Sequence, residues 1–227
     1  RGLVPLNHIS HPKPMVEIDV GALPTRMSEL LYVLRRESRD AGDWRRVMDG
    51  LRPKTQALWS RLPEAERRRF LRHALPWWSI HRHRVAPDVF RRFESMVQSG
   101  QLSVRAGYLR DVEEAEGLTL RYRPRGQSII ASIRADWIVN CTGMERAGIA
   151  HSPLLQEMHR KRLIEADPLR LGLVVDARSR IPASNGSHAV IYAVGALTAG
   201  QFWEITAVPD IRVQARRVAE AIADELR

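Results

Sequence analysis

The stretch IYAVGALTAGQFWEITAVPDIRVQ, residues 191–214, decides how the C-terminal part of this chain folds. It begins as a short apolar strand, passes through a turn that holds Gly195 and Gly200, and reaches Pro209, which suits the first turn of a long amphipathic helix. Glycines let the backbone approach a ligand closely, and a helix N-terminus offers free N–H groups and positive potential. The pattern predicts a place for an electron-rich or anionic group, although an ordinary strand-to-helix connection shares it.

A second informative stretch runs from Trp137 to Gly143. Its apolar residues occupy consecutive positions, which is typical of a strand buried on both faces. Such a strand, ending at Thr142 and Gly143, lets the chain pass close to a flat or phosphorylated ligand, but a plain strand-to-loop glycine gives the same pattern. We expect the lone Cys141 to be an inert core residue.

Two segments, VNCTG (139–143) and AVGALTAGQFWEITAVPDIRVQA (193–215), together resemble the closing part of two-dinucleotide-domain flavoproteins. More narrowly, they resemble poorly characterised bacterial FAD/NAD(P)-binding proteins that carry W-E-x-T-A-V-P-x-I-R-x-Q near the C-terminus. The likeness covers most of the chain, since it extends through Leu51–Pro53, Gln56–Trp59, Arg68–His73 and His81–Arg84. It implies an FAD-dependent, NAD(P)H-linked oxidoreductase that acts on a small-molecule substrate of unknown identity.

The resemblance also implies which residues meet the cofactor. The strand end at 142–143 would line the edge of the FAD, the turn 195–200 would lie beneath it, and residues 204–208 would face the pyrimidine side of the flavin. The candidate cofactor-binding residues are Thr142, Gly143, Gly195, Thr198, Gly200, Trp203, Glu204, Thr206, Ala207 and Val208.

The helix that follows this turn would stabilise negative charge on the flavin through its dipole. Pro209 has no N–H, so the N–H groups of Thr206, Ala207 and Val208 are the candidate donors. The basic loop with His81, His83 and Arg84 is a weaker candidate for facing the substrate or an NAD(P)H phosphate. No residue is assigned a catalytic role.

Two departures from the flavoprotein pattern stand out. The G-x-G-x-x-G loop that holds the FAD pyrophosphate does not occur, and Gly195-Ala196 stands where many such proteins have Gly-Asp. The chain also starts without methionine, and Gly2–Leu6 has the pattern of a strand exit. We expect it to be the C-terminal portion of a longer protein whose missing N-terminal segment binds FAD. By itself this portion should be inactive and hold no cofactor.

The net charge of +10 comes almost entirely from arginine, because Lys13, Lys54 and Lys161 are the only lysines. The densest basic run, Arg67–Arg69, is interleaved with acids, which favours a solvated helix face over a nucleic-acid surface. The single cysteine fits a reducing cytoplasm, and no apolar run is long enough to span a membrane.

No metal site is expected. The histidines of the His81–Arg84 loop have arginine neighbours that would repel a cation, and no full zinc motif follows. Two other functions stay open: a non-catalytic basic module that binds an anionic partner such as nucleic acid, and a structural or interaction domain without cofactor. The oligomeric state is not predicted.

Residue patterns predict a mixed α/β (α+β) fold class in four parts. The first three are an irregular connecting arm (1–24), a helical subdomain (25–100) and a small antiparallel β-meander (101–136). The resemblance to flavoproteins implies that the fourth (137–227) is the C-terminal part of a Rossmann-like FAD-binding domain. We expect N-caps at Thr25 and Asp43, a helix that Pro87 opens and Gly100 ends, and a helix from Ser152 to about Leu163. The expected strands are 102–106, 118–122, 129–133, 137–141, 171–175 and 189–194.

Overall fold

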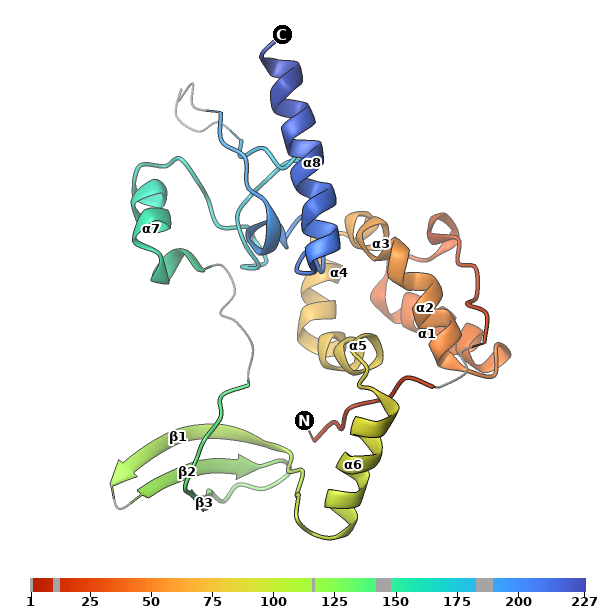
Figure 1. Cartoon of the computed structure of the whole chain (residues 1–227), viewed down its shortest axis with the longest axis vertical. Coiled ribbons are helices and arrows are strands. Elements are labelled where there is room, and N and C mark those ends of the chain that lie inside the picture. The colour runs from red at the N-terminus through yellow and green to blue at the C-terminus, as the bar shows by residue number, and fades with distance from the viewer. Residues whose placement is uncertain (1, 10–12, 116, 142–147, 183–189) are drawn as a thin grey trace. The chain divides into compact units, whose positions relative to one another are not determined.

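The structure is a computed structural model that describes residues 2–9, 13–115, 117–141, 148–182 and 190–227 (Figure 1). Its contacts divide the chain into two compact units, each described by itself below. Unit 1 comprises Arg1–Pro14 and His73–Gly143, and unit 2 comprises Met15–Arg72 and Met144–Arg227. Among the helices in the described ranges, none has the length and apolar character needed to cross a membrane.

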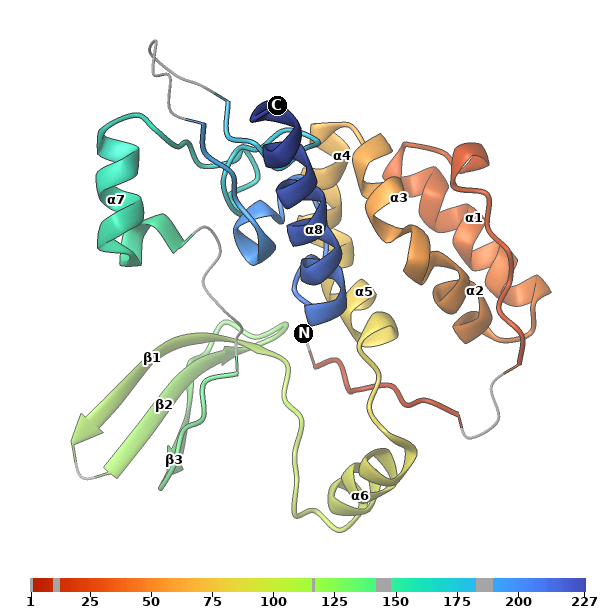
Figure 2. The same cartoon turned by 45° about the horizontal axis from the view of Figure 1, so that its top comes forward.

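Unit 2 begins with four short α-helices and closes with a long one. The helices are α1 (Met27–Asp40), α2 (Trp44–Leu51), α3 (Thr55–Arg61), α4 (Glu64–Arg69), α7 (Pro153–Arg160) and α8 (Val208–Glu225). Short 3-10 turns occur at Val20–Ala22, Arg52–Lys54, Gly148–His151 and Gly195–Thr198. Figure 2 shows α1, α2 and α3 packed side by side, and Val47 and Leu51 of α2 are almost fully buried there.

N-caps were predicted for two helices of unit 2, and the structure confirms one of them. The Asp43 carboxylate accepts a hydrogen bond from the Arg45 N–H (2.9 Å), which confirms Asp43 as the N-cap of α2. The prediction for Thr25 is wrong, because Arg26 is the N-cap of α1 and makes no side-chain cap. The Met27 N–H instead donates to the Glu66 carboxylate of α4 (2.7 Å), so a tertiary contact replaces the local one.

A second core in unit 2 lies among the loops of the C-terminal half. Its buried members come from four separate stretches of chain, and they are Ile164, Leu173, Val175, Ile181 and Ala193. Part-buried side chains of α7, Leu155 and Met158, pack against this cluster. The Ser152 hydroxyl accepts from the Leu155 N–H (3.4 Å), which confirms the predicted start of that helix.

Unit 1 contains two helices and the sheet. They are α5 (Leu75–Arg82), α6 (Pro87–Gln98), β1 (Gly107–Ala115), β2 (Gly117–Pro124) and β3 (Ala131–Ala135). The strands form an antiparallel sheet in the order β1-β2-β3, which confirms the meander. Leu120 lies opposite Val112 on one side and Ile133 on the other, so these apolar residues share one face. The strand predicted at 102–106 lies instead in the connection before β1.

The helix boundaries of unit 1 follow the proline and glycine signals. Pro87 begins α6, and Gly100, at φ +77°, follows its last turn in the left-handed conformation, as predicted. The π-helical turn Phe70–Ala74 precedes α5. Pro76 has no N–H to give the carbonyl of Arg72 and its ring crowds that carbonyl, so a widened turn at this point relieves the conflict.

The three strands predicted for the C-terminal part are not regular strands in the described residues. Residues 171–175 and 190–194 make single antiparallel bridges, Ala166 with Leu173 and Arg180 with Tyr192. Trp137 is 86% exposed and Val139 80%, and Cys141 is exposed as well, so the buried strand and the core cysteine were wrong. A strand buried on both faces needs strand neighbours on both sides, and in the described residues the only sheet consists of β1, β2 and β3 and does not include this segment.

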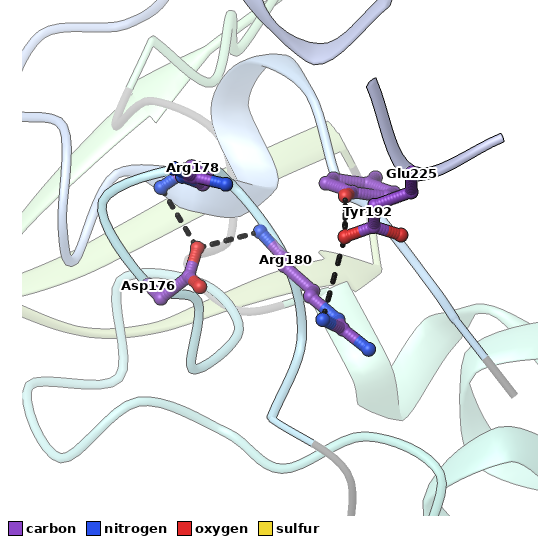
Figure 3. Close-up of polar contacts among 5 residues, drawn as sticks. All are labelled: Asp176, Arg178, Arg180, Tyr192 and Glu225. Atoms are coloured by element: carbon purple, nitrogen blue, oxygen red, sulfur yellow. Dashed lines mark hydrogen bonds and ion pairs between the residues drawn. The ribbon is translucent and has the colours of Figure 1, made fainter. Parts of the chain in front are cut away.

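Polar contacts join the last turn of α8 to the loop at residues 176–180 (Figure 3). The Asp176 carboxylate accepts from the backbone N–H groups of Arg178 (2.8 Å) and Arg180 (2.9 Å), which shapes the loop. Glu225 of α8 accepts from the Tyr192 hydroxyl (2.9 Å) and pairs with the Arg180 guanidinium (3.4 Å). The C-terminal end of α8 is thereby tied to the second core.

The contact between Tyr192 and Glu225 predicts that the phenol of Tyr192 titrates at a raised pH. Loss of hydration, and then the hydrogen bond to the negatively charged Glu225, raise the pKa of the Tyr192 phenol above its ordinary 10.0. The folded protein therefore holds this proton more tightly than the unfolded chain. The resulting stability is complete below about pH 10 and is lost as the pH rises through the folded-state pKa.

The measurement is a pH titration of phenolate absorbance in the wild type and in Tyr192→Phe, whose difference reports Tyr192 alone. We expect this difference to appear with a midpoint above pH 10. In Glu225→Gln the midpoint should fall back towards 10. A midpoint at or below 10 in the wild type would contradict the contact that Figure 3 shows.

Candidate functional site

The residues from Gly195 to Val208, hereafter the candidate segment, run from a 3-10 turn to the first residue of α8. Its first half alternates between buried and more accessible residues, with Ala196 exposed. Gly195, Gly200 and Trp203 are all buried, and the side chain of Thr198 has no exposed surface. The second half reaches the surface: Glu204 is half-buried, Thr206 and Ala207 are exposed, and Val208 is 77% exposed. The exposed residues next to the start of α8 therefore lie in this second half.

Trp203 anchors the candidate segment to the helices of unit 2. Its ring stacks on Trp59 of α3 with centroids 4.5 Å apart and meets Phe70 edge-on at 5.4 Å. The Trp59 indole N–H donates to the carbonyl of Gly200 (2.9 Å), so the stack also holds the glycine turn. The indole Nε1 of Trp203 is buried without a hydrogen-bond partner among the described atoms.

Two glycines allow the turn to pack tightly on the loop before it. A Cβ on Gly200 would lie 2.6 Å from Cγ of Asp167, and one on Gly172 would lie 2.0 Å from the carbonyl oxygen of Leu197. The buried Asp167 carboxylate accepts from the backbone N–H groups of Leu169, Leu171 and Gly172 at 2.9, 2.5 and 2.6 Å. Asp167 therefore shapes its own loop and is not free for chemistry.

The start of α8 has the free donors that an anion requires. Ala207 is the N-cap, in extended conformation, and no side chain caps the helix. The Thr206 N–H is already used, since it donates to the carbonyl of Glu204 (2.7 Å). Glu204 itself has a φ of +60°, in the left-handed region. In the described part of the chain, the N–H groups of Ala207 and Val208 have no such acceptor. Asp210 in the first turn adds a negative charge that competes with a ligand anion.

A small pocket of about 210 Å³ lies next to the first half of the segment. Its lining includes Gly200, Gln201 and Asp167 together with Glu64 and Arg67 of α4. The Arg67 guanidinium lies over the Trp59 ring (5.2 Å) and donates to the carbonyls of Leu62 (2.8 Å) and Ser60 (3.0 Å), and burial lowers its pKa. Cofactor pockets usually measure about 300–1,000 Å³, so this one does not enclose a flavin.

The remaining predicted residues do not join this arrangement. Thr142 and Gly143 lie outside the described residues. His81 in the last turn of α5, His83 at its C-cap and Arg84 after it belong to unit 1. The His81 Nδ1 is 2.7 Å from the carbonyl oxygen of Trp77, and His83 is exposed. Among the described residues, no cluster of three or more His, Cys, Asp or Glu side chains could hold a metal ion.

The candidate segment offers donors for one edge of an electron-rich ring at the start of α8. The two free N–H groups and the positive end of an 18-residue helix suit the electron-rich pyrimidine edge of the ring. Gly195, at φ +80°, makes a turn that residues with a side chain rarely adopt. The sequence offers no G-x-G-x-x-G cradle for the pyrophosphate.

One buried side chain that supports the segment was missed in the sequence. Gln214 lies on the inner face of α8, 5% exposed, four residues before the buried Val218. A glutamine at an apolar position of an amphipathic helix is the available signal, because a buried amide must find hydrogen-bond partners.

Comparison with known proteins gives one informative likeness. No protein-family model matches the chain, and no curated protein matches it. A similar fold occurs in the reduced form of ornithine hydroxylase (PvdA) from Pseudomonas aeruginosa, with a TM-score of 0.53 and 20% identity. The likeness covers 79% of this chain and 43% of that one, so the chain spans less than half of the hydroxylase. Together with the helices and the three-stranded antiparallel sheet, it confirms the predicted mixed α/β class.

Proposed function

We propose that this chain forms one wall of the cofactor site of an FAD-dependent, NAD(P)H-linked oxidoreductase. The observation that carries the proposal is the uncapped start of α8, where the exposed residues Ala207 and Val208 follow a turn that contains the buried Gly195 and Gly200. The similar fold supports it, because the ornithine hydroxylase that shares this fold has a reduced form and is hence a redox enzyme. The resemblance of residues 139–143 and 193–215 to flavoproteins adds independent support.

Each part of the candidate segment has a role in this proposal. The stack of Trp203 on Trp59 fixes the turn, and the turn fixes the direction in which α8 starts. Ala207 and Val208 then donate hydrogen bonds to the pyrimidine edge of the ring, and the helix dipole favours negative charge there. A bound flavin supplies the hydride and electron transfer between NAD(P)H and an acceptor. A segment beyond these residues supplies the pyrophosphate cradle.

The Val208→Pro variant tests the role of the helix start. Val208 is the first residue of α8, a position at which proline preserves the helix while removing the N–H. Losing this donor from the flavin edge should cost about 0.3–1 kcal/mol, which lowers the two-electron reduction potential of the bound flavin by about 7–20 mV. The measurement is a redox titration of the flavin in the complete gene product.

The matched control is Val208→Ala, which shortens the same exposed side chain and keeps the N–H. Its flavin potential should equal that of the wild type. Equal potentials in the proline and alanine variants would rule out Val208 as a donor to the ring.

A further inference from the structure

Gln214 makes the densest buried polar contacts around the candidate segment. Its side-chain oxygen accepts from the Gly195 N–H (2.8 Å), and its Nε2 donates to the hydroxyls of Ser179 (3.0 Å) and Thr198 (2.9 Å). Three stretches of chain thus meet at one amide of α8: the loop with Ser179, the turn from Gly195 to Thr198, and the helix itself. All four side chains or glycines in this network are buried.

The network fixes the orientation of the amide. The Thr198 hydroxyl has one hydrogen, and it donates this to the carbonyl of Gly195 (2.8 Å). Its oxygen can therefore only accept from Gln214, which places the NH₂ group on the hydroxyl side and the oxygen on the Gly195 side. Both backbone polar groups of Gly195 are consequently held, one by Gln214 directly and the other through Thr198.

These hydrogen bonds fix the backbone of Gly195, which has an unusual conformation. It starts the turn in the left-handed region, at φ +80°, and a Cβ placed on it would contact Ile211 on the first turns of α8 at 3.8 Å. The glycine lies 19 residues before Gln214 in sequence. The amide therefore couples the start of the candidate segment to the helix whose N-terminus ends it.

We infer that Gln214 is a positioning residue for the flavin site: it holds the Gly195–Thr198 turn against α8 so that the N–H groups of Ala207 and Val208 keep a fixed direction. This inference rests on the proposed function. A polar group buried at this point is otherwise costly, since an apolar residue would fill the same helix face without needing partners. Gln214 touches no ligand atom in this role; it acts through the backbone of Gly195.

The test compares Gln214→Leu with Ser179→Ala in the complete gene product. Gln214→Leu removes all three hydrogen bonds of the amide and frees the Gly195 N–H, whereas Ser179→Ala removes one of the three and leaves the Gly195 N–H bonded. We expect the flavin Kd of Gln214→Leu to rise about tenfold, with a changed visible circular dichroism of the bound flavin. Amide hydrogen exchange at Gly195 should accelerate in this variant. Ser179→Ala should keep the flavin Kd and the visible spectrum of the wild type.

A second variant covers the case in which Gln214→Leu does not fold. Thr198→Val has nearly the shape of the native residue. It releases the carbonyl of Gly195 and removes one acceptor of the Gln214 amide, but it keeps the hydrogen bond from the Gly195 N–H to Gln214, so the flavin Kd should rise about threefold. Unchanged flavin binding in both Thr198→Val and Gln214→Leu would overturn the inference about Gln214. Equal effects of Gln214→Leu and Ser179→Ala on flavin binding would overturn it as well. Neither result would contradict the proposed function. A wild type that binds no flavin would overturn both the inference and the proposed function.

Discussion

Replacing Trp59 by alanine should destabilise unit 2 by about 3–5 kcal/mol, the usual cost of truncating a buried tryptophan. Trp59 is 2% exposed and makes the central contact of the aromatic cluster, stacked on Trp203 and edge-on to Phe70 at 5.9 Å. Its removal also leaves the carbonyl of Gly200 without its indole donor. Urea denaturation followed by circular dichroism measures the effect.

Two further variants show whether the loss of stability in Trp59→Ala comes from the buried ring and its hydrogen bond. Trp59→Phe keeps an aromatic ring but loses the hydrogen bond to Gly200, so its cost should be smaller, about 1–3 kcal/mol. Trp77→Ala removes an exposed tryptophan and should change stability by no more than about 0.5 kcal/mol. A cost below about 1 kcal/mol for Trp59→Ala would show that the stack does not anchor the candidate segment.

Gly172→Ala should be among the most disruptive single-methyl changes in unit 2. The added Cβ would lie 2.0 Å from the carbonyl oxygen of Leu197 and 2.6 Å from its carbonyl carbon. These are backbone atoms inside the turn of the candidate segment, and the Leu173 N–H donates to the same oxygen (2.7 Å). Because no side-chain rotation relieves the clash, we expect a loss of at least about 3 kcal/mol and a displaced turn.

Gly148→Ala is the matched control for this prediction. Gly148 has an ordinary φ, and no atom lies within 4 Å of the Cβ it would gain. Its melting temperature should equal that of the wild type, whereas Gly172→Ala should melt several degrees lower or fail to fold. Similar melting of the two variants would contradict the close approach of residues 172 and 197.

The parts of the fold that sequence predicted correctly depend on neighbouring residues. The Asp43 cap, the α6 boundaries and the meander each follow from a few positions along the chain. The Thr25 cap failed because its role passed to Glu66, 39 residues away from Met27. The strand at 137–141 failed for a similar reason, since burial of a strand depends on partners that its own residues do not specify.

In the candidate segment, too, features set by neighbouring residues were predicted and contacts between distant residues were not. Its pattern correctly placed a glycine turn before a helix that starts near Pro209. It did not show that the Thr206 N–H donates to the carbonyl of Glu204, because a contact between residues two apart depends on the backbone angles of the residue between them, which the pattern does not specify. Nor did it assign Gln214, whose partners are as far as 35 residues away.

The central claim is that this chain is one wall of a flavin site, and the visible spectrum of the purified complete gene product tests it most directly. We predict absorption bands near roughly 370 and 450 nm, the signature of bound flavin, that bleach when NAD(P)H is added without air. The bands should persist through gel filtration. A well-folded protein that is colourless, and stays colourless after incubation with FAD and removal of the excess, would contradict the account.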